Sequence, residues 1–389
     1  MRIGRAAVTN ILAKLLILST SLVFSMLAAE LVARVMLDPI DYLNPTVVPD
    51  EVLGHRIEGN TGGHDAWGFR NARRPETADI VCIGDSMTYG VIIPASESWP
   101  VMLAKLSGES VYNMALGGYG PIQYLYLLEN LAVKLRPRIV IVGFYFGNDF
   151  LDVYGLGRSK KHWSKYKVET ANLTQGGELI YPRGPGKFLG SLRDWLSKNS
   201  MLYTLVTERS IFDFIRDREL TARGASDSDL IRYRDEKHQV TFNLALRFLN
   251  LRDPRLQNAM QVTGNLMSDM QSVAEKSGIR LIIALIPTKE RVYGKLIQQA
   301  GYREKYPRLA DTLDQEDRAR VWMINLLRQL RIETLDLLPA QEAAVSDHDL
   351  YPLADPHPNK YGARVIAKAI DDYLKVHPSS EAVAAQLQN

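Results

Sequence analysis

The stretch Ile80-Val81-Cys82-Ile83-Gly84-Asp85-Ser86-Met87-Thr88-Tyr89-Gly90 contains the strongest structural signal in the sequence. It is a short apolar run rich in β-branched residues, followed by a Gly-Asp-Ser turn. That pattern is typical of a buried strand that leads into a helix. Ser86 then lies at the carboxyl end of a parallel strand, where open α/β sheets bind ligands. Its hydroxyl is a candidate nucleophile, although Ser86 could equally cap the following helix through Oγ.

Length and composition indicate a globular protein. The 389 residues are 46% hydrophobic and 23% charged, which suits two or three average domains or one domain with a large insertion. The net charge of +3 is too small to indicate a nucleic-acid partner. Cys82 is the single cysteine, so an internal disulfide framework is excluded, and this position suits a small buried side chain.

The basic N-terminus leads into an apolar segment, Ile11–Leu37. This segment can cross a bilayer if Lys14 and Arg34 extend toward the headgroups and Glu30 lies near that layer. A cleaved signal peptide is the alternative, but the sequence has no clear Ala-x-Ala cleavage site. We therefore expect an uncleaved single-pass anchor in the cytoplasmic membrane, with the positive flank inside and the remaining chain exported to the periplasm.

Beyond a Pro-, Asn- and Gly-rich approach, strand and helix patterns alternate, which predicts a parallel sheet. The expected strands are 80–83, 111–114, 139–144, 279–286 and 332–335. The expected helices are 98–106, 121–136, 260–276, 314–330 and 359–376. Five strands with interleaved helices predict an α/β fold, a flavodoxin-like, doubly wound parallel sheet.

The alternation stops after the third strand, which predicts an inserted helical cap over the working edge of the sheet. The cap would contain a basic stretch with Trp163 and Tyr166, and one or two amphipathic helices between Leu192 and Ile215. A solvated insertion without a binding role is the alternative. The expected organisation is an anchor (1–37), an approach segment (38–78), a first core half (79–150), a cap (151–257), a second core half (258–378) and a disordered tail (379–389).

Polar residues follow four of the predicted strands, and a parallel sheet would bring them to one edge. Ser86 would be the nucleophile, His357 its base, and Asp355 the carboxylate that orients the imidazole. The Ser86 and Gly118 backbone N–H groups and the Asn148 amide would bind the oxyanion. Taken singly, each residue could be only a turn or a helix cap.

The blocks Gly84-Asp85-Ser86, Asn113 to Gly118, Gly147-Asn148-Asp149 and Asp355-x-His357 resemble the four sequence blocks of the SGNH/GDSL hydrolase superfamily, in the family's order. The resemblance implies that Ser86, Gly118, Asn148 and His357 are the four residues for which the family is named. The family's acid commonly precedes its histidine by three positions, where this chain has Ala354. Asp355 is therefore the preferred acid, and Asp349 and Asp347 are alternatives.

Other site types receive little support from the sequence. The seven histidines are scattered without a zinc motif, and the run Gly117-Gly118-Tyr119-Gly120 lacks dinucleotide-binding spacing, so we expect no metal and no cofactor. Trp163, Tyr166, Tyr119 and Asp149 are candidate substrate contacts, although core packing is the simpler role for the two cap aromatics.

The sequence predicts an exported serine esterase that removes O-acetyl or other short acyl groups from a cell-envelope or secreted polysaccharide. Alternatives are an O-acyltransferase with the same triad, a lipase or lysophospholipase, and a non-catalytic glycan-binding scaffold. The expected partners are an ester-bearing glycan or lipid and the membrane. The sequence does not indicate an oligomeric state.

Overall fold

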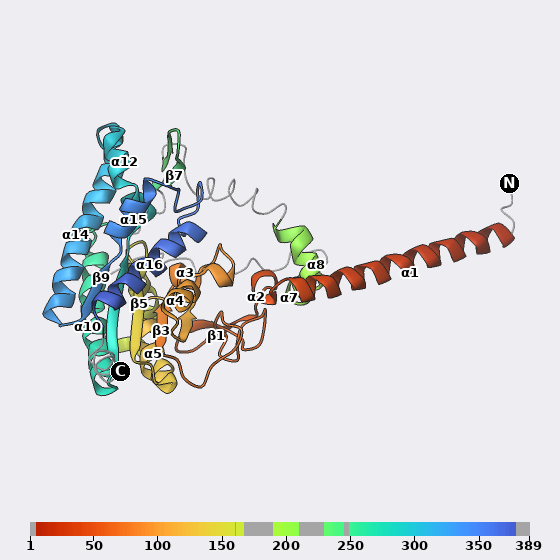
Figure 1. Ribbon diagram of the computed structural model, residues 1–389, viewed down its shortest axis with the longest axis horizontal. Coiled ribbons are helices and arrows are strands. Elements are labelled where there is room, and N and C mark those ends of the chain that lie inside the picture. The colour runs from red at the N-terminus through yellow and green to blue at the C-terminus, as the bar shows by residue number, and fades with distance from the viewer. Residues whose placement is uncertain (1–4, 160, 167–189, 210–228, 245–248, 379–389) are drawn as a thin grey trace.

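The computed structural model describes residues 5–159, 161–166, 190–209, 229–244 and 249–378. They form an α/β body from which one long helix projects (Figure 1). The expected tail, 379–389, and much of the expected cap lie outside the described residues.

The body is built on a five-stranded, fully parallel sheet with strand order β4-β3-β5-β8-β9. Its strands are β3 (Ile80–Gly84), β4 (Val111–Ala115), β5 (Ile139–Tyr145), β8 (Arg280–Ile286) and β9 (Glu333–Asp336). The chain forms β3 first, places β4 on one side of it, and then adds β5, β8 and β9 on the other side. This is the flavodoxin-like order, so the predicted fold class is confirmed.

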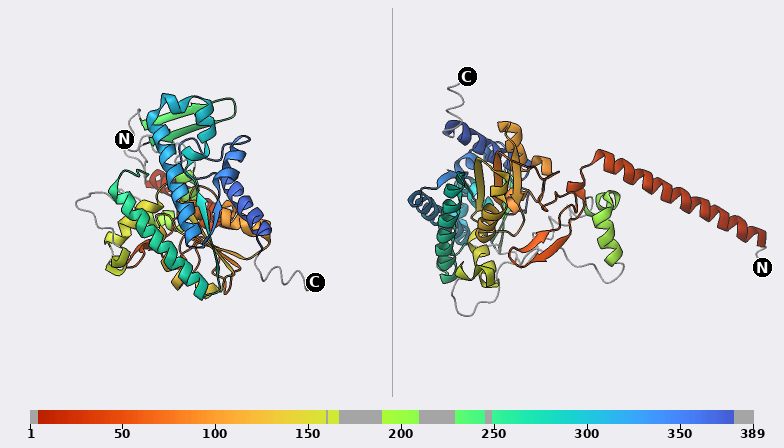
Figure 2. Two further views of the ribbon diagram at one scale, coloured as in Figure 1. Left: turned by 90° about the vertical axis from the view of Figure 1, so that its left-hand side faces the viewer. Right: turned by 90° about the horizontal axis from the view of Figure 1, so that it is seen from below.

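Helices cover both faces of this sheet (Figures 1 and 2). One face is covered by α4 (Trp99–Ser107) and α16 (Lys360–Val376). The opposite face is covered by α5 (Pro121–Asn130), α10 (Pro254–Lys276) and α14 (Pro307–Gln329). Residues of the central strands alternate between the two apolar layers, because neighbouring side chains of a strand point to opposite faces. For example, Ile80 and Cys82 pack in the α4–α16 layer, whereas Val81 and Ile83 pack in the other.

Two glycines on neighbouring strands let the helix after β3 approach the sheet. Gly84 and Gly143 are register partners. A Cβ atom on Gly84 would lie 2.1 Å from Thr88 Oγ1, and one on Gly143 would lie 2.5 Å from it. Thr88 belongs to α3 (Ser86–Tyr89), and its side chain occupies the space that both glycines leave open. The position of Ser86 over the sheet therefore depends on the absence of these two side chains.

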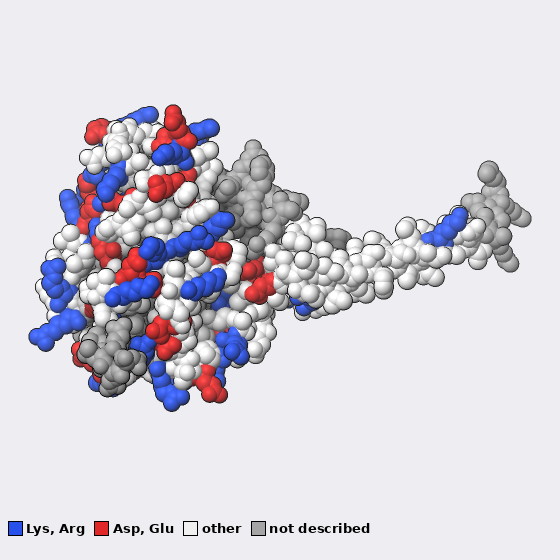
Figure 3. Space-filling view, in the orientation of Figure 1, with Lys and Arg blue, Asp and Glu red and all other residues white. Residues whose placement is uncertain are grey.

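The long projecting helix is α1 (Arg5–Met36). Its segment Thr9–Met36 is long and apolar enough to cross a membrane. In Figure 3 its surface is almost entirely uncharged between a basic residue near the far end and the charged groups at its base.

The approach segment is more ordered than the loop-rich stretch expected from the sequence. It contains α2 (Pro39–Tyr42) and an antiparallel hairpin of β1 (Val47–Asp50) and β2 (Gly54–Ile57). Buried Arg70 pairs with Asp41 at 2.8 Å and donates to the carbonyls of Tyr89 and Gly90 at the end of α3. The segment thus packs against the helix that carries Ser86.

The described parts of the insertion pack in three different places. Helix α6 (Asp149–Ser159) and the short helix η3 (Lys161–Tyr166) lie beside α5 and α10. Helices α7 (Gly190–Asn199) and α8 (Met201–Thr204) lie beside the base of α1. An antiparallel hairpin, β6 (Leu230–Arg234) with β7 (Gln239–Asn243), packs on the helices that follow β8. The prediction of a helical insertion is therefore wrong for residues 230–243, which form this hairpin.

Shorter elements connect the larger ones. They are η1 (Ala95–Glu97), η2 (Ala132–Leu135), the π-helical turn η4 (Leu205–Arg209), α11 (Lys289–Val292), α12 (Gly294–Gln299), α13 (Tyr302–Lys305) and α15 (Leu338–Val345). The expected helix over 121–136 ends at Asn130 and continues after Leu131 as η2.

We predict that Gly143→Ala lowers the stability of the fold. The new Cβ would meet Thr88 Oγ1 at 2.5 Å and Ile286 Cδ1 at 3.2 Å. Overpacking of this kind typically costs about 1–3 kcal/mol, which thermal unfolding would report as a lower Tm. Gly264→Ala is the matched control. Gly264 lies inside α10, and its new Cβ would lie 3.5 Å from the Leu326 side chain of α14, an ordinary contact, so Tm should hold or rise. An unchanged Tm for Gly143→Ala would contradict the close packing of α3 on the sheet.

Candidate active site

Ser86 lies at the carboxyl edge of the sheet, in the first turn of α3. Asp85 is the N-cap of this helix, and its Oδ1 accepts from the Met87 N–H at 2.9 Å. Gly90 ends the helix in the left-handed conformation, with φ of 76°. Backbone N–H groups of a first turn have no partner within the helix, so that of Ser86 can serve a ligand.

His357 connects Ser86 to a buried carboxylate. Its Nε2 lies 2.8 Å from Ser86 Oγ, and its Nδ1 lies 2.7 Å from Asp355 Oδ1. A carboxylate can only accept, so Nδ1 carries the proton and Nε2 is the acceptor that faces the Ser86 hydroxyl. This chain of hydrogen bonds has the geometry of a nucleophile, a general base and an orienting acid.

The two-residue spacing between Asp355 and His357 is accommodated by a local turn. Asp355 Oδ1 also accepts the backbone N–H of His357 at 2.8 Å, so one carboxylate oxygen binds both the backbone and the ring of the same residue. Of the two alternative acids, Asp349 binds His238 at 3.0 Å and Tyr293 Oη at 2.9 Å, and Asp347 is exposed. The structure therefore brings Asp355, and neither alternative, to His357.

Lys289 holds the loop that precedes His357. Its side chain is buried, and its Nζ donates to the carbonyls of Pro352 at 2.7 Å, Leu353 at 2.9 Å and Asp355 at 3.4 Å. The ammonium group thus fixes the backbone of the acid. Lys289 is the first residue of α11 (Lys289–Val292), which begins shortly after β8 ends at Ile286. The end of β8 therefore also supports the site. No local sequence pattern indicates this role, because the partners of Lys289 are backbone carbonyls more than sixty positions away.

The loop after β4 passes beside Ser86. A Cβ atom on Gly117 would lie 3.8 Å from that of Ser86, and Gly118 has φ of 78°, a conformation that glycine adopts readily. His55 holds this loop through a 3.0 Å hydrogen bond between Nε2 and the Gly117 carbonyl. The predicted donor Gly118 therefore belongs to a loop adjacent to the nucleophile.

Asn148 lies among carboxyl groups. Its Nδ2 donates to Asp152 Oδ2 at 2.8 Å, and its Oδ1 is buried without a partner among the described residues. One N–H group of the Asn148 amide is thus used by Asp152. An amide NH₂ has two N–H groups, so the second would be the one to bind an oxyanion.

Three acids with altered pKa values surround this amide. Burial raises the pKa of Asp85 to about 6, and its hydrogen bond to Met87 and the charge of His357 partly offset that rise. Burial and repulsion from Asp85 raise the pKa of Asp152 well above its usual range. Burial and the neighbouring carboxyl groups raise that of Asp149, which accepts from Tyr124 Oη at 2.9 Å and the Tyr145 N–H at 2.9 Å. Asp149 is thus a buried structural acid, with no exposed surface for a substrate.

The candidate aromatic contacts are also buried. Trp163 packs in the core and donates through Nε1 to the Val52 carbonyl at 2.7 Å. Tyr166 is 2% exposed and donates to Asp269 on α10. Tyr119 is 1% exposed and donates to the His55 carbonyl at 2.9 Å. The structure brings none of these three aromatic rings to the Ser86–His357 pair as an accessible surface, which corrects the expectation that they contact substrate.

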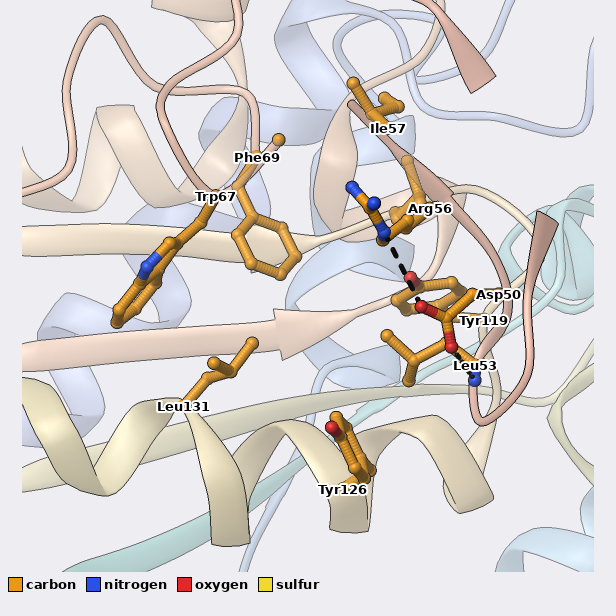
Figure 4. Close-up of a pocket in the computed structure, with 11 residues that line it drawn as sticks. Asp50, Leu53, Arg56, Ile57, Trp67, Phe69, Tyr119, Tyr126 and Leu131 are labelled. Atoms are coloured by element: carbon orange, nitrogen blue, oxygen red, sulfur yellow. Dashed lines mark hydrogen bonds and ion pairs between the residues drawn. The ribbon is translucent and has the colours of Figure 1, made fainter. Parts of the chain in front are cut away.

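A cavity of about 170 Å³ lies between the approach segment and α5 (Figure 4). Its walls include Leu53, Trp67, Phe69, Tyr126 and Leu131, with the ion pair of Asp50 and Arg56 also lining it. Neither Ser86 nor His357 lines it, so it is separate from the candidate active site.

We predict that Asp85→Asn stabilises the protein at neutral pH and not in acid. The pKa of Asp85 is raised from 3.8 to about 6, so the unfolded chain loses this proton first and stability falls as pH rises between those values. Asparagine caps a helix about as well as aspartate and carries no charge. The gain should reach roughly 1–3 kcal/mol above pH 6. Thermal unfolding of both proteins at about pH 4 and about pH 7.5 measures it, and a difference in Tm that is independent of pH would contradict it.

We predict that Lys289→Met slows catalysis by placing His357 less accurately. The expected result is a fall in kcat of about tenfold or more with little change in KM, because misplacement affects the reacting groups. Labelling with a fluorophosphonate separates this from misfolding: the rate of labelling at Ser86 should fall while the final amount stays the same. Lys295→Met, which removes an exposed lysine near α11, is the control. A lower amount labelled at an unchanged rate would contradict the positioning role.

Comparisons with known proteins agree with this geometry. Residues 248–388 match the family model described as "ALGX: SGNH hydrolase-like domain, acetyltransferase AlgX". No curated protein matches the chain.

Among solved structures, a lipolytic protein of the G-D-S-L family from Desulfitobacterium hafniense is similar at 14% identity with a TM-score of 0.35, over 75% of this chain and 97% of that chain. An acetylxylan esterase from Geobacillus stearothermophilus is similar at 10% identity with a TM-score of 0.37, over 78% of this chain and 94% of that chain. The family match confirms the resemblance to the SGNH/GDSL superfamily, with residues 248–388 matching an SGNH hydrolase-like domain.

Proposed function

We propose that this protein is an extracytoplasmic serine esterase that removes acetyl or other short acyl groups from hydroxyls of a cell-envelope or secreted polysaccharide. The observation that carries the proposal is the chain of hydrogen bonds from Ser86 Oγ through His357 to Asp355, at 2.8 and 2.7 Å. Such a chain raises the nucleophilicity of a serine toward an acyl carbonyl.

The reaction would proceed in two steps. Ser86 Oγ attacks the ester carbonyl while His357 Nε2 takes its proton, and the leaving alcohol then receives that proton. Asp355 holds the imidazole and stabilises its charged form. The Ser86 and Gly118 N–H groups, with one N–H group of the Asn148 amide, would stabilise the oxyanion. Water then attacks the acyl-enzyme with His357 again acting as the base, which releases the acid and restores Ser86.

Acyl transfer to a sugar hydroxyl is a second candidate, and the description of the matching family as an acetyltransferase favours it. The first half-reaction is the same. The two functions differ in whether water or an acceptor hydroxyl resolves the acyl-enzyme. The same description supports acetyl as the acyl group.

An extracytoplasmic location is supported by α1. Its apolar segment Thr9–Met36 is exposed and follows a basic N-terminus. In a membrane, the basic end would remain cytoplasmic and the α/β body would lie on the opposite side. The acyl groups of envelope glycans occur on that side, which supports a polysaccharide as the substrate class.

We predict that Ser86→Ala abolishes hydrolysis of p-nitrophenyl acetate by the full chain in detergent, with kcat falling by about 10⁴-fold or more. Asp355→Ala should reduce kcat by about a hundredfold or more, because the imidazole loses its orientation. Asp347→Asn, at the exposed alternative acid, should retain full activity. Adding an acetyl-free oligosaccharide then separates the two candidates: a transferase would acetylate it, and an esterase would not.

Equal rates for the wild type and Ser86→Ala would contradict both enzymatic candidates and favour a glycan-binding scaffold. Loss of activity in Asp347→Asn, with activity retained in Asp355→Ala, would contradict the assignment of the acid.

A further inference from the structure

Helices α7 and α8 are joined to the last turns of α1 by a charged cap. The Glu30 carboxylate of α1 accepts from Ser200 Oγ at 2.9 Å, the Met201 N–H at 3.1 Å and the Leu202 N–H at 2.9 Å. These groups lie at the N-terminus of α8, where N–H groups lack helical partners and a negative charge is favourable. Arg34, one turn further along α1, pairs with Glu30 and donates to the Asn199 carbonyl at the end of α7.

This attachment places the two short helices at the depth where α1 would leave a membrane. The apolar segment Thr9–Met36 has 28 residues, or about 42 Å of helix, against a hydrocarbon core of about 30 Å. The surplus is about 12 Å, which corresponds to the last eight residues if it lies at the outer end. Glu30 and Arg34 both fall within those residues. With the surplus at the outer end, the N-terminus of α8 would lie at the level of the headgroup layer.

The outer side of this pair of helices is apolar. On α7, Leu192 is 47% exposed and Trp195 is 58% exposed, and their spacing of three residues puts them on one face. Leu205 and Val206, just after α8, are 37% and 58% exposed. The other side of α7 faces the protein, where Ser197 is buried and its carbonyl accepts the Asn44 N–H at 2.9 Å. Figures 1 and 2 show both helices beside the base of α1.

We propose that α7 and α8 form a membrane-docking surface, with Leu192 and Trp195 inserted at the boundary between headgroups and acyl chains of the bilayer that α1 crosses. The proposal rests on the membrane anchoring that is part of the proposed function. Tryptophan is enriched at this boundary, because its ring is apolar and its N–H needs a polar partner. The charged residues Arg193, Asp194 and Lys198 alternate with the apolar ones, as in helices that lie in the interface plane.

Helix α8 packs beside α1, whose apolar side chains are exposed, which favours lipid as the occupant over a separate protein. It also makes α1 a structural part of the mature chain. Cleavage of α1 after Met36 would remove the Glu30 carboxylate and Ala33, which is only 7% exposed, and would leave the α8 N–H groups that Glu30 caps without this partner. With α7 also bonded to Asn44, the α/β body would have a defined orientation on the membrane.

The test uses nitroxide labels on the full chain, one chain per nanodisc of phosphatidylcholine and phosphatidylglycerol. Trp195→Cys tests the surface, Leu18→Cys reports on the span of α1, and Val321→Cys, an apolar residue 59% exposed on α14, is the matched control. Native Cys82 is fully buried and its thiol pKa is raised by burial, so it should not take the label. We expect the labels at 195 and 18 to be relaxed more by oxygen than by a water-soluble nickel complex, and the label at 321 to show the opposite.

A label at 195 that behaves like the one at 321, while that at 18 lies in lipid, would overturn the docking surface and leave the anchor intact. A label at 18 that lies in water would overturn the anchor and with it the docking. A label at 195 that neither reagent reaches would indicate that this face packs against the protein itself, which also overturns the proposal. Glu30→Gln should increase the mobility of the label at 195 and leave p-nitrophenyl acetate hydrolysis unchanged. Unchanged mobility would overturn the role of the Glu30 cap.

Discussion

The hydrogen bond between Ser86 Oγ and His357 Nε2 joins residues 271 positions apart in the sequence, and the candidate chemistry depends on it. Neither residue is near the other along the chain. The parallel sheet brings them together, because β3 ends two residues before Ser86 and the chain beyond β9 returns to the same edge before α16. The close packing of Thr88 against Gly84 and Gly143 then sets the height of the nucleophile above the sheet.

Buried charges fix the remaining geometry. Lys289 binds the carbonyls before His357, and Arg70 binds those at the end of the helix that carries Ser86. Each cation acts on the backbone of one half of the site. Three acids lie behind the nucleophile, where burial raises the pKa of Asp85, Asp149 and Asp152. Burial disfavours the charged form of these acids. Keeping Asp85 charged at neutral pH therefore lowers the free energy of unfolding, while its carboxylate holds the start of the helix that carries Ser86.

The sheet and the nucleophile could be predicted from the sequence because their signals are local. Apolar runs marked all five strands to within one or two residues, and the polar residues after them marked the common edge. The preferred acid could be inferred only by its distance from His357, and the structure places Asp355 there. Helices α10 and α14 begin several residues before their predicted starts, each with a proline in the first turn. The hairpin β1–β2 escaped prediction because β1 contains Pro49 and β2 begins with Gly54, residues that are depleted in strands. The hairpin β6–β7 was missed because it lies in an insertion that was expected to be helical.

Roles that depend on distant contacts could not be predicted. Trp163 and Tyr166 occur in a basic stretch that suits either a surface or a core, and only the packing of η3 shows them to be buried.

The most direct test of the central claim is mass spectrometry of the protein mixed briefly with p-nitrophenyl acetate and quenched in acid. The proposed mechanism predicts one added acetyl group, on the peptide that contains Ser86. Turnover of the ester with no acetyl on that peptide, or with acetyl on another residue, would contradict it.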